Sequence, residues 1–221
     1  MSGLILANNL LVTSNHKCGS TALDSLFSER YIVKGSVNNG LQFDYSFQKK
    51  RHANLNSTPW KHAHADVWLK FLELKGLTER PKILTSVRNP WDRIVSLYHY
   101  NSVYKTNLSP VNFESFVRQF CADSASYDRF PDFAISRDGT FRADYVIRLE
   151  NIEEELNNFF AEEKIDLKAS FDMSNNDTIN SSKRKKDYRA FYNDETAQLV
   201  FDYFKHEISN FEYSFDSVIS N

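Results

Sequence analysis

Residues 10–21 read LLVTSNHKCGST and join an apolar run to a polar turn and a helix start. The run from Leu10 to Ser14 predicts a short buried strand, and apolar residues at helical spacing after Ser20 predict a helix. A strand that passes through a glycine turn into a helix is typical of α/β folds. Such a turn suits an anion, because a helix N-terminus offers unpaired amides and partial positive charge.

The turn also carries side chains that suit a phosphate. Gly19 allows the backbone to come close, Ser20 and Thr21 offer hydroxyl donors, and Lys17 adds a full positive charge. The alternative interpretation is a capped helix beside a solvated lysine, and the turn alone does not decide between the two. The triphosphate-loop pattern G-x-x-x-x-G-K-[ST] is absent, because the lysine precedes the glycine. This order argues against an ordinary ATPase or GTPase.

A second strand–turn–helix unit lies at residues 83–98, ILTSVRNPWDRIVSLY. Its apolar start predicts a core strand, and Asn89 with Pro90 predicts a helix start with proline at the first position. Arg88 falls at the strand end, and Ser96 lies about two turns into the helix. Arginine suits phosphate because its planar fork bonds bidentately. The alternative is a surface arginine and a helix serine without a joint role.

The rest of the chain supports a single α/β domain over residues 1–221. Its central, mainly parallel sheet is expected to be flanked by helices, and ligands bind beyond the carboxyl ends of such strands. Further elements are predicted as a strand at 145–147 and helices at 62–74, 113–121, about 152–160 and from about 194 onward.

Composition excludes several classes of protein. The net charge of −2 lacks the basic excess of a nucleic-acid binder. Two cysteines, Cys18 and Cys121, make no disulfide framework and fit a reducing compartment. The first 14 residues do not resemble a secretion signal, and no apolar run of about 20 residues occurs, so a cytoplasmic protein without a membrane span is expected. Metal-ligand spacing is absent among the histidines and cysteines, so no metal is expected.

Residues 16–21 and 88–98 together resemble the two cofactor motifs of sulfotransferases that use 3′-phosphoadenosine 5′-phosphosulfate (PAPS). HKCGST is similar to the 5′-phosphosulfate loop P-K-x-G-T-T/S, although His16 stands where the family most often has proline. RNPWDRIVSLY is similar to the 3′-phosphate motif R-[DN]-P-x-x-R-x-x-S-x-Y. Four further segments resemble the carbohydrate-sulfotransferase branch and its bacterial relatives: residues 61–65, 148–152, 188–195 and 211–215.

The resemblance implies a P-loop NTPase-like sulfotransferase fold and transfer of a sulfuryl group from PAPS to an acceptor hydroxyl by in-line attack. The product is then PAP, and a carbohydrate or glycan is the expected acceptor. Lys17 would contact the oxygen that bridges sulfate and phosphate, where negative charge develops as the S–O bond breaks. The residues implied for the 5′-phosphate are Cys18, Gly19, Ser20 and Thr21, and those for the 3′-phosphate are Arg88 and Ser96.

The acceptor hydroxyl also needs a base, and histidine suits this task near neutral pH. His62 matches the histidine of a family segment and is the first candidate, and His64 is the second. On one helix the two would point about 200° apart, so one of them faces the site. Two exposed helix-start histidines are the alternative, and a glutamate base stays open. His52 and His99 are weaker candidates.

The basic stretch at 181–186 falls where the family has a loop that closes over the cofactor. Lys183 and Lys186 are therefore candidates for the 3′-phosphate, and a solvated charge run is the equally weighted alternative. Arg148 and Glu150 belong to a family-like segment, for which a structural ion pair or hydrogen-bond network beside the sheet is expected.

The acceptor is expected to lie between residues 35–60 and 122–142. A tryptophan platform for sugar stacking is one hypothesis for Trp60, Trp68 and Trp91, and the last two are also candidates for core packing. Two other functions remain: a small-molecule kinase that uses ATP and Mg²⁺, and a non-catalytic nucleotide- or glycan-binding relative. The pattern from Arg88 to Ser96 argues against the kinase, and the presence of Lys17 argues against loss of activity.

Overall fold

The computed structural model describes eight stretches of the chain: residues 3–5, 9–13, 15–27, 65–74, 79–104, 112–122, 143–164 and 186–216. The chain forms two compact units. The first consists of Met1–Val87 and Phe130–Ile179, and the second of Arg88–Arg129 and Asn180–Asn221. The extent of one domain over residues 1–221 stays a prediction.

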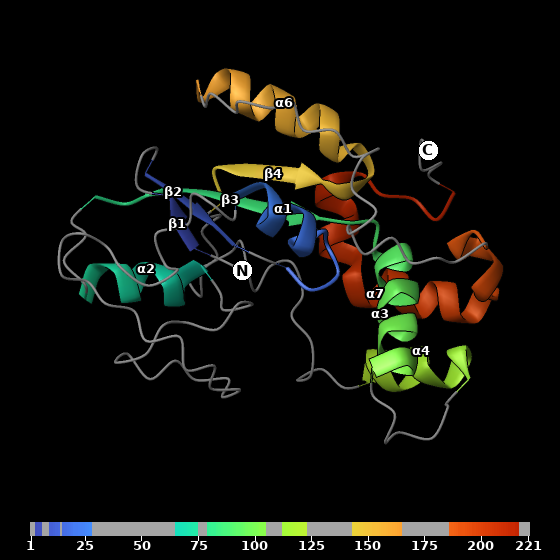
Figure 1. The fold of residues 1–221 in the computed structure, drawn as a ribbon. Coiled ribbons are helices and arrows are strands. Elements are labelled where there is room, and N and C mark those ends of the chain that lie inside the picture. The colour runs from blue at the N-terminus through green and yellow to red at the C-terminus, as the bar shows by residue number, and fades with distance from the viewer. Residues whose placement is uncertain are drawn as a thin grey trace. The chain divides into compact units, whose positions relative to one another are not determined.

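The first unit holds a four-stranded sheet in the order β1 (Gly3–Ile5), β2 (Leu10–Val12), β3 (Lys82–Val87) and β4 (Tyr145–Arg148) (Figure 1). Strand β1 is antiparallel to β2, whereas β2, β3 and β4 are parallel. The predicted α/β class with a mainly parallel sheet is therefore confirmed. Because the three strands are parallel, their carboxyl ends lie at one edge of the sheet.

Two helices of this unit pack on one face of the sheet. Leu10, Val12 and Leu84 form a core with α1 (Ser20–Phe27) and α6 (Ile152–Glu162). Helix α6 buries one stripe at helical spacing, which is why it lies flat on the strands: Ile152, Leu156, Phe159 and Phe160. The alternate strand residues Leu11 and Ile83 are fully buried as well. In the view of Figure 1, α6 lies above the strands and α2 (Ala65–Leu74) below them.

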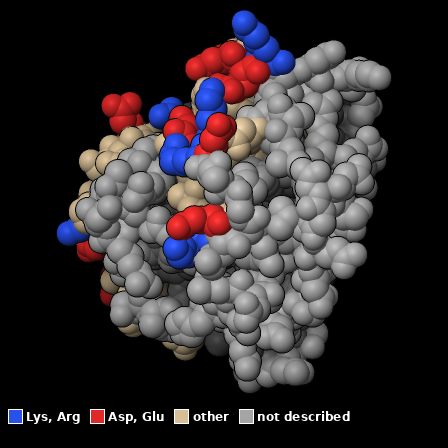
Figure 2. All heavy atoms as spheres, turned by 90° about the vertical axis from the view of Figure 1, so that its left-hand side faces the viewer, with Lys and Arg blue, Asp and Glu red and all other residues tan. Residues whose placement is uncertain are grey.

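Ion pairs tie the strand starts of this unit to neighbouring segments. Arg80 contacts Asp144 at 3.1 Å, and Lys82 contacts Glu163 at 2.6 Å. The described acidic and basic side chains are interspersed on the face drawn in Figure 2. These pairs reach solvent, so each contributes little to the free energy of unfolding.

The second unit consists of α3 (Pro90–Tyr104), α4 (Phe113–Ala122), the 3₁₀ turn η4 (Tyr188–Phe191) and α7 (Asp194–Phe211). Helix α4 runs one residue past its predicted end, and α7 begins at the predicted aspartate. The core of the unit is rich in aromatic residues and consists of Trp91, Ile94, Val95, Leu97, Phe113, Val117, Phe120, Tyr188, Val200, Phe204 and Ile208.

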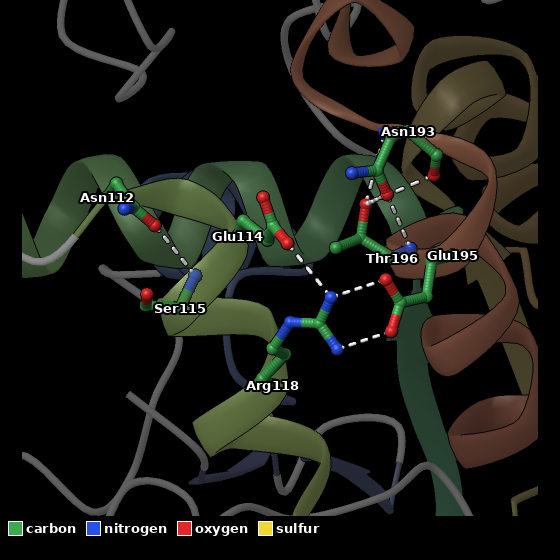
Figure 3. A network of polar contacts seen from close by, with 7 residues as sticks. All are labelled: Asn112, Glu114, Ser115, Arg118, Asn193, Glu195 and Thr196. Carbon is green, nitrogen blue, oxygen red and sulfur yellow. Dashed lines mark hydrogen bonds and ion pairs between the residues drawn. The ribbon is translucent and has the colours of Figure 1, made fainter.

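Polar contacts fix where α4 meets the start of α7 (Figure 3). Arg118 of α4 bonds both carboxylate oxygens of Glu195 and also Glu114, the latter at 2.9 Å. Asn193 caps α7, because its Oδ1 accepts from the Thr196 amide at 2.9 Å and its own amide donates to Thr196 Oγ1 at 3.1 Å. The helix therefore starts at a defined place beside α4.

None of the helices in the described ranges is long and apolar enough to cross a membrane.

Candidate functional site

The turn between β2 and α1 has an unusual backbone. Lys17 has a φ of 61° and Gly19 a φ of 79°, both in the left-handed region. Glycine adopts this region freely, whereas for lysine it costs about 1–2 kcal/mol. Backbone strain at a non-glycine residue clusters at functional sites. Lys17, which the sequence singled out for its charge, is thus one of four described non-glycine residues with a positive φ, and the one that lies in this turn.

One hydrogen bond continues the pairing of β2 with β3, and a second holds the turn against the carboxyl end of β3. The Thr13 amide donates to the Leu84 carbonyl at 2.8 Å, and Ser86 Oγ donates to the Cys18 carbonyl at 2.5 Å. Ser86 and Cys18 are both fully buried. The turn is thus placed where parallel sheets bind their ligands.

A close contact explains why residue 19 is a glycine. A Cβ at this position would lie 2.6 Å from Cδ1 of Leu149, in the 3₁₀ turn η2 (Leu149–Asn151) that follows β4. Sequence reasoning linked Gly19 to close approach of a phosphate, and the structure adds this packing against Leu149. The family-like segment at 148–152 therefore supports the turn through its leucine.

Helix α1 begins directly after the turn. Its first hydrogen bond runs from the Leu23 amide to the Gly19 carbonyl at 3.1 Å, as expected for a helix that starts at Ser20. Ser20 and Thr21 are partly exposed, whereas Leu23 is fully buried in the core. The helix start thus presents amides and hydroxyls beside partly exposed Lys17. This donor set suits an anionic group.

Arg88 follows β3 by one peptide bond and belongs to the second unit with Ser96. Its Nε donates to Asp92 Oδ2 at 2.7 Å, and its Nη2 lies 2.6 Å from the same oxygen. Ser96 is buried on α3, with 8% of its surface exposed. The residues predicted for the two phosphates are therefore described in two units, and they are linked covalently through β3.

Asn89 builds the start of α3 and confirms the helix start predicted at Pro90. Its Oδ1 accepts from the Trp91 amide at 3.1 Å, and its Nδ2 donates to the Ser214 carbonyl at 3.1 Å. The neighbouring Phe215 carbonyl accepts from the Tyr188 hydroxyl at 2.6 Å. Residues 214–215 thus hold the first turn of α3 from more than a hundred residues further along the chain.

Arg93, the second arginine of the 88–98 motif, is buried. It lies 3.4 Å from Glu207 of α7, with 5% and 1% of the two side chains exposed. Its guanidinium also stands 5.5 Å from the ring centroid of Phe204. Arg93 therefore joins α3 to α7, a role that sequence reasoning did not assign.

The two described tryptophans of the sugar-platform hypothesis lie in the core. Trp68 is 1% exposed and Trp91 is 3% exposed, and Trp91 Nε1 donates to the Ala197 carbonyl at 2.9 Å. The stacking hypothesis is wrong for both, because neither ring face reaches solvent. The apolar neighbours of both tryptophans at helical spacing had correctly indicated the alternative, which is packing in the core.

Other predicted residues have less definite surroundings. His99 is partly buried, with its ring 5.3 Å from that of Phe191. The Arg148 amide donates to Glu155 Oε2 at 2.5 Å, and burial raises the pKa of Glu155. Lys186 is exposed just before η4. The predicted residues His52, Trp60, His62, His64 and Lys183 lie outside the described residues, as do residues 35–60 and 123–142.

Within the described stretches, no group of three or more His, Cys, Asp or Glu side chains is placed to hold a metal ion.

Comparison with known proteins identifies the family. Residues 7–133, more than half of the chain, match the sulfotransferase domain, and this range includes both motifs. The chain belongs to the sulfotransferase domain family. Membership supports sulfuryl transfer to a hydroxyl-bearing acceptor as the reaction of this protein.

A solved structure and a sequence search add to this result. The sulfotransferase chain is similar to mouse sulfotransferase SULT7A1 complexed with PAP, with a TM-score of 0.56 and 18% identity over 90% of this chain and 83% of that one. At this identity the likeness shows a shared fold. No curated protein sequence matches the chain significantly.

Proposed function

We propose that this sulfotransferase moves the sulfuryl group of PAPS to a hydroxyl of a carbohydrate or glycan, and releases PAP. The observation that carries the proposal is the turn at residues 15–19, where strained Lys17 stands beside the start of α1 at the carboxyl edge of the sheet. Membership in the family and the 88–98 motif support the same cofactor. The PAP bound to the mouse structure is a further reason to test it.

The chemistry follows from the groups around the turn. The acceptor oxygen forms a bond to sulfur while the bond from sulfur to the oxygen of the 5′-phosphate breaks. Negative charge grows on that oxygen, and the Lys17 ammonium stabilises it. Cys18, Gly19, Ser20 and Thr21 hold the 5′-phosphate through the amides and hydroxyls of the helix start. Fixed positive groups carry the charge, so the proposal needs no metal.

Recognition of the 3′-phosphate is assigned to Arg88 and Ser96. Lys183 and Lys186 are proposed as further contacts from the basic stretch. The 3′-phosphate separates PAPS from AMP and ATP, so these residues determine which nucleotide binds. Substitution of any of these residues is expected to lower the ratio of PAP affinity to AMP affinity, which is the quantity to measure.

The proposed base is His62, with His64 as the second candidate. The base removes the proton of the acceptor hydroxyl as its oxygen attacks sulfur. His62→Ala is expected to lower turnover by about 10² to 10⁴-fold with His64→Ala as the matched control. If only His64→Ala has this effect, the assignment is reversed, and if neither does, the base is a carboxylate or one of the weaker candidates His52 and His99.

The acceptor class rests on the carbohydrate-branch segments, which include residues 188–195 and 211–215. Residues 35–60 and 122–142 are proposed to form its walls. We place the reaction in the cytoplasm, because two cysteines, Cys18 and Cys121, make no disulfide framework and fit a reducing compartment. Turnover of sulfated sugar, measured with labelled PAPS and a panel of saccharides and small phenols, tests the acceptor class.

Thermal unfolding with PAP, with AMP and with ATP plus Mg²⁺ tests the cofactor first. A ligand at about 100 times its Kd adds about 2.7 kcal/mol, which for this chain length raises Tm by about 5–10 °C. We expect this rise with PAP in the wild type and its loss in Arg88→Ala. A rise with ATP and Mg²⁺ but none with PAP would replace the proposal with the kinase. PAP binding without turnover would favour the non-catalytic relative.

A further inference from the structure

Asp92 is a buried carboxylate in the first turn of α3, four residues after Arg88. The residue is 3% exposed, and its Oδ2 receives both Nε of Arg88 at 2.7 Å and Nη2 at 2.6 Å. Only 14% of the arginine side chain and 4% of the aspartate side chain reach solvent. Charge-assisted bonds of this length in a buried place fix the orientation of the guanidinium.

The backbone around Asp92 is fixed as well. Its amide donates to Oδ1 of Asn89 at 3.4 Å, and Asn89 is tied to the Ser214 carbonyl. Asp92 stands in the first turn of α3, where the helix dipole favours a negative charge. The carboxylate therefore has a fixed position. Its hydrogen bonds restrict the side chain of Arg88, which would otherwise sample many rotamers.

The pair has a consequence for phosphate binding that charge alone does not predict. A carboxylate this close neutralises Arg88 and repels a dianionic phosphate. An arginine held in one plane, however, bonds a phosphate in a fixed geometry and loses less conformational entropy on binding. Orientation thus raises the affinity for the phosphate and repulsion lowers it. Whether removing the charge of Asp92 weakens or strengthens phosphate binding shows which effect is larger.

We propose that Asp92 is a positioning residue that orients Arg88 for the 3′-phosphate and so sets the preference of the enzyme for PAP over AMP. The inference rests on the proposed function. Both of these contacts with Asp92 lie on the Nε–Nη2 edge of the guanidinium.

Isothermal titration with PAP and with AMP tests the proposal. The variants are wild type, Asp92→Asn, Arg88→Ala and the double variant Arg88→Ala/Asp92→Asn. Asp92→Asn is expected to weaken PAP binding by roughly 10-fold or more and to leave AMP binding unchanged, because only the 3′-phosphate contact is disturbed. In the Arg88→Ala background the same change is expected to have no further effect on PAP, since the residue it positions is absent.

Glu207→Gln is the matched control. It disturbs the other buried pair of α3, so it lowers Tm, and the ratio of PAP affinity to AMP affinity stays at the wild-type value. Asp92→Glu keeps the charge but shifts the carboxylate, so it is also expected to weaken PAP binding and to leave AMP binding unchanged. This variant gives the answer if Asp92→Asn does not fold.

Several outcomes would overturn the proposal. Tighter PAP binding by Asp92→Asn would show that repulsion is the larger effect. Equal weakening of PAP and AMP, or equal effects with and without Arg88, would show a structural role. A wild type that does not distinguish PAP from AMP would instead refute the proposed function, so the two failures are separable.

Discussion

Replacing Gly19 with alanine would test how the turn is supported. The new Cβ has two costs, because residue 19 has a φ of 79° and Leu149 Cδ1 would lie 2.6 Å away. The left-handed conformation costs an alanine about 1–2 kcal/mol. Crowding against a packed side chain adds about 1–3 kcal/mol, and Leu149 is partly buried against the core. The expected loss in free energy of unfolding is therefore about 2–5 kcal/mol.

Urea unfolding of four proteins separates these two costs: wild type, Gly19→Ala, Leu149→Ala and the double variant. Leu149→Ala removes the atom that the new Cβ would meet. In that background, Gly19→Ala should cost only the conformational part, about 1–2 kcal/mol. The same cost in both backgrounds would refute the steric argument. A loss below about 0.5 kcal/mol in Gly19→Ala itself would refute both parts, since changes of that size are ordinary for surface substitutions.

Substitutions at two other residues give independent tests. Lys17→Ala and Lys17→Gly should both lower turnover by at least about 10²-fold, because each removes the ammonium. In urea unfolding Lys17→Gly should be more stable than Lys17→Ala by about 0.5–1 kcal/mol, because glycine relieves the left-handed strain at a cost in unfolded-chain entropy; equal stability would contradict that strain. Burial raises the pKa of Tyr188 to about 12 from the ordinary 10.0, so its neutral form stabilises the fold fully below pH 10 and loses this effect as pH rises through 12. The free energy of unfolding between pH 10 and 12 should therefore fall more steeply for wild type than for Tyr188→Phe, and parallel curves would show that this tyrosine does not carry the effect.

Local signals in the sequence predicted most of the described elements. Helical spacing of apolar residues located α4 and α6, and the Asn89-Pro90 pair located the start of α3. Strand β1 was missed, because three residues show no period and its partner β2 lies beyond a turn. Periodicity also favoured a core position for Trp68, which the structure confirms.

The candidate site was predicted in its residue types but not in its supports. The contact of Gly19 with Leu149 and the pair of Arg93 with Glu207 join residues more than a hundred positions apart, and no local pattern encodes such contacts. Asp92 stands four residues after Arg88, but Arg88 lies before the first residue of α3, so the rule for side-chain pairs on a helix surface does not predict this contact.

Because residues 214–215 contact the start of α3 and its neighbour Tyr188, they determine when this part of the protein can fold during synthesis on the ribosome. Arg88 emerges early in synthesis, but the carbonyl that Asn89 needs is made about 125 residues later. A nascent chain can thus complete the turn after β2 once Leu149 has been made, and the helix start beside Arg88 only after Ser214 has been made. Contacts of such long sequence separation form late and slowly. Under the proposed function, the nascent protein should therefore form its 5′-phosphate site first and its 3′-phosphate site last.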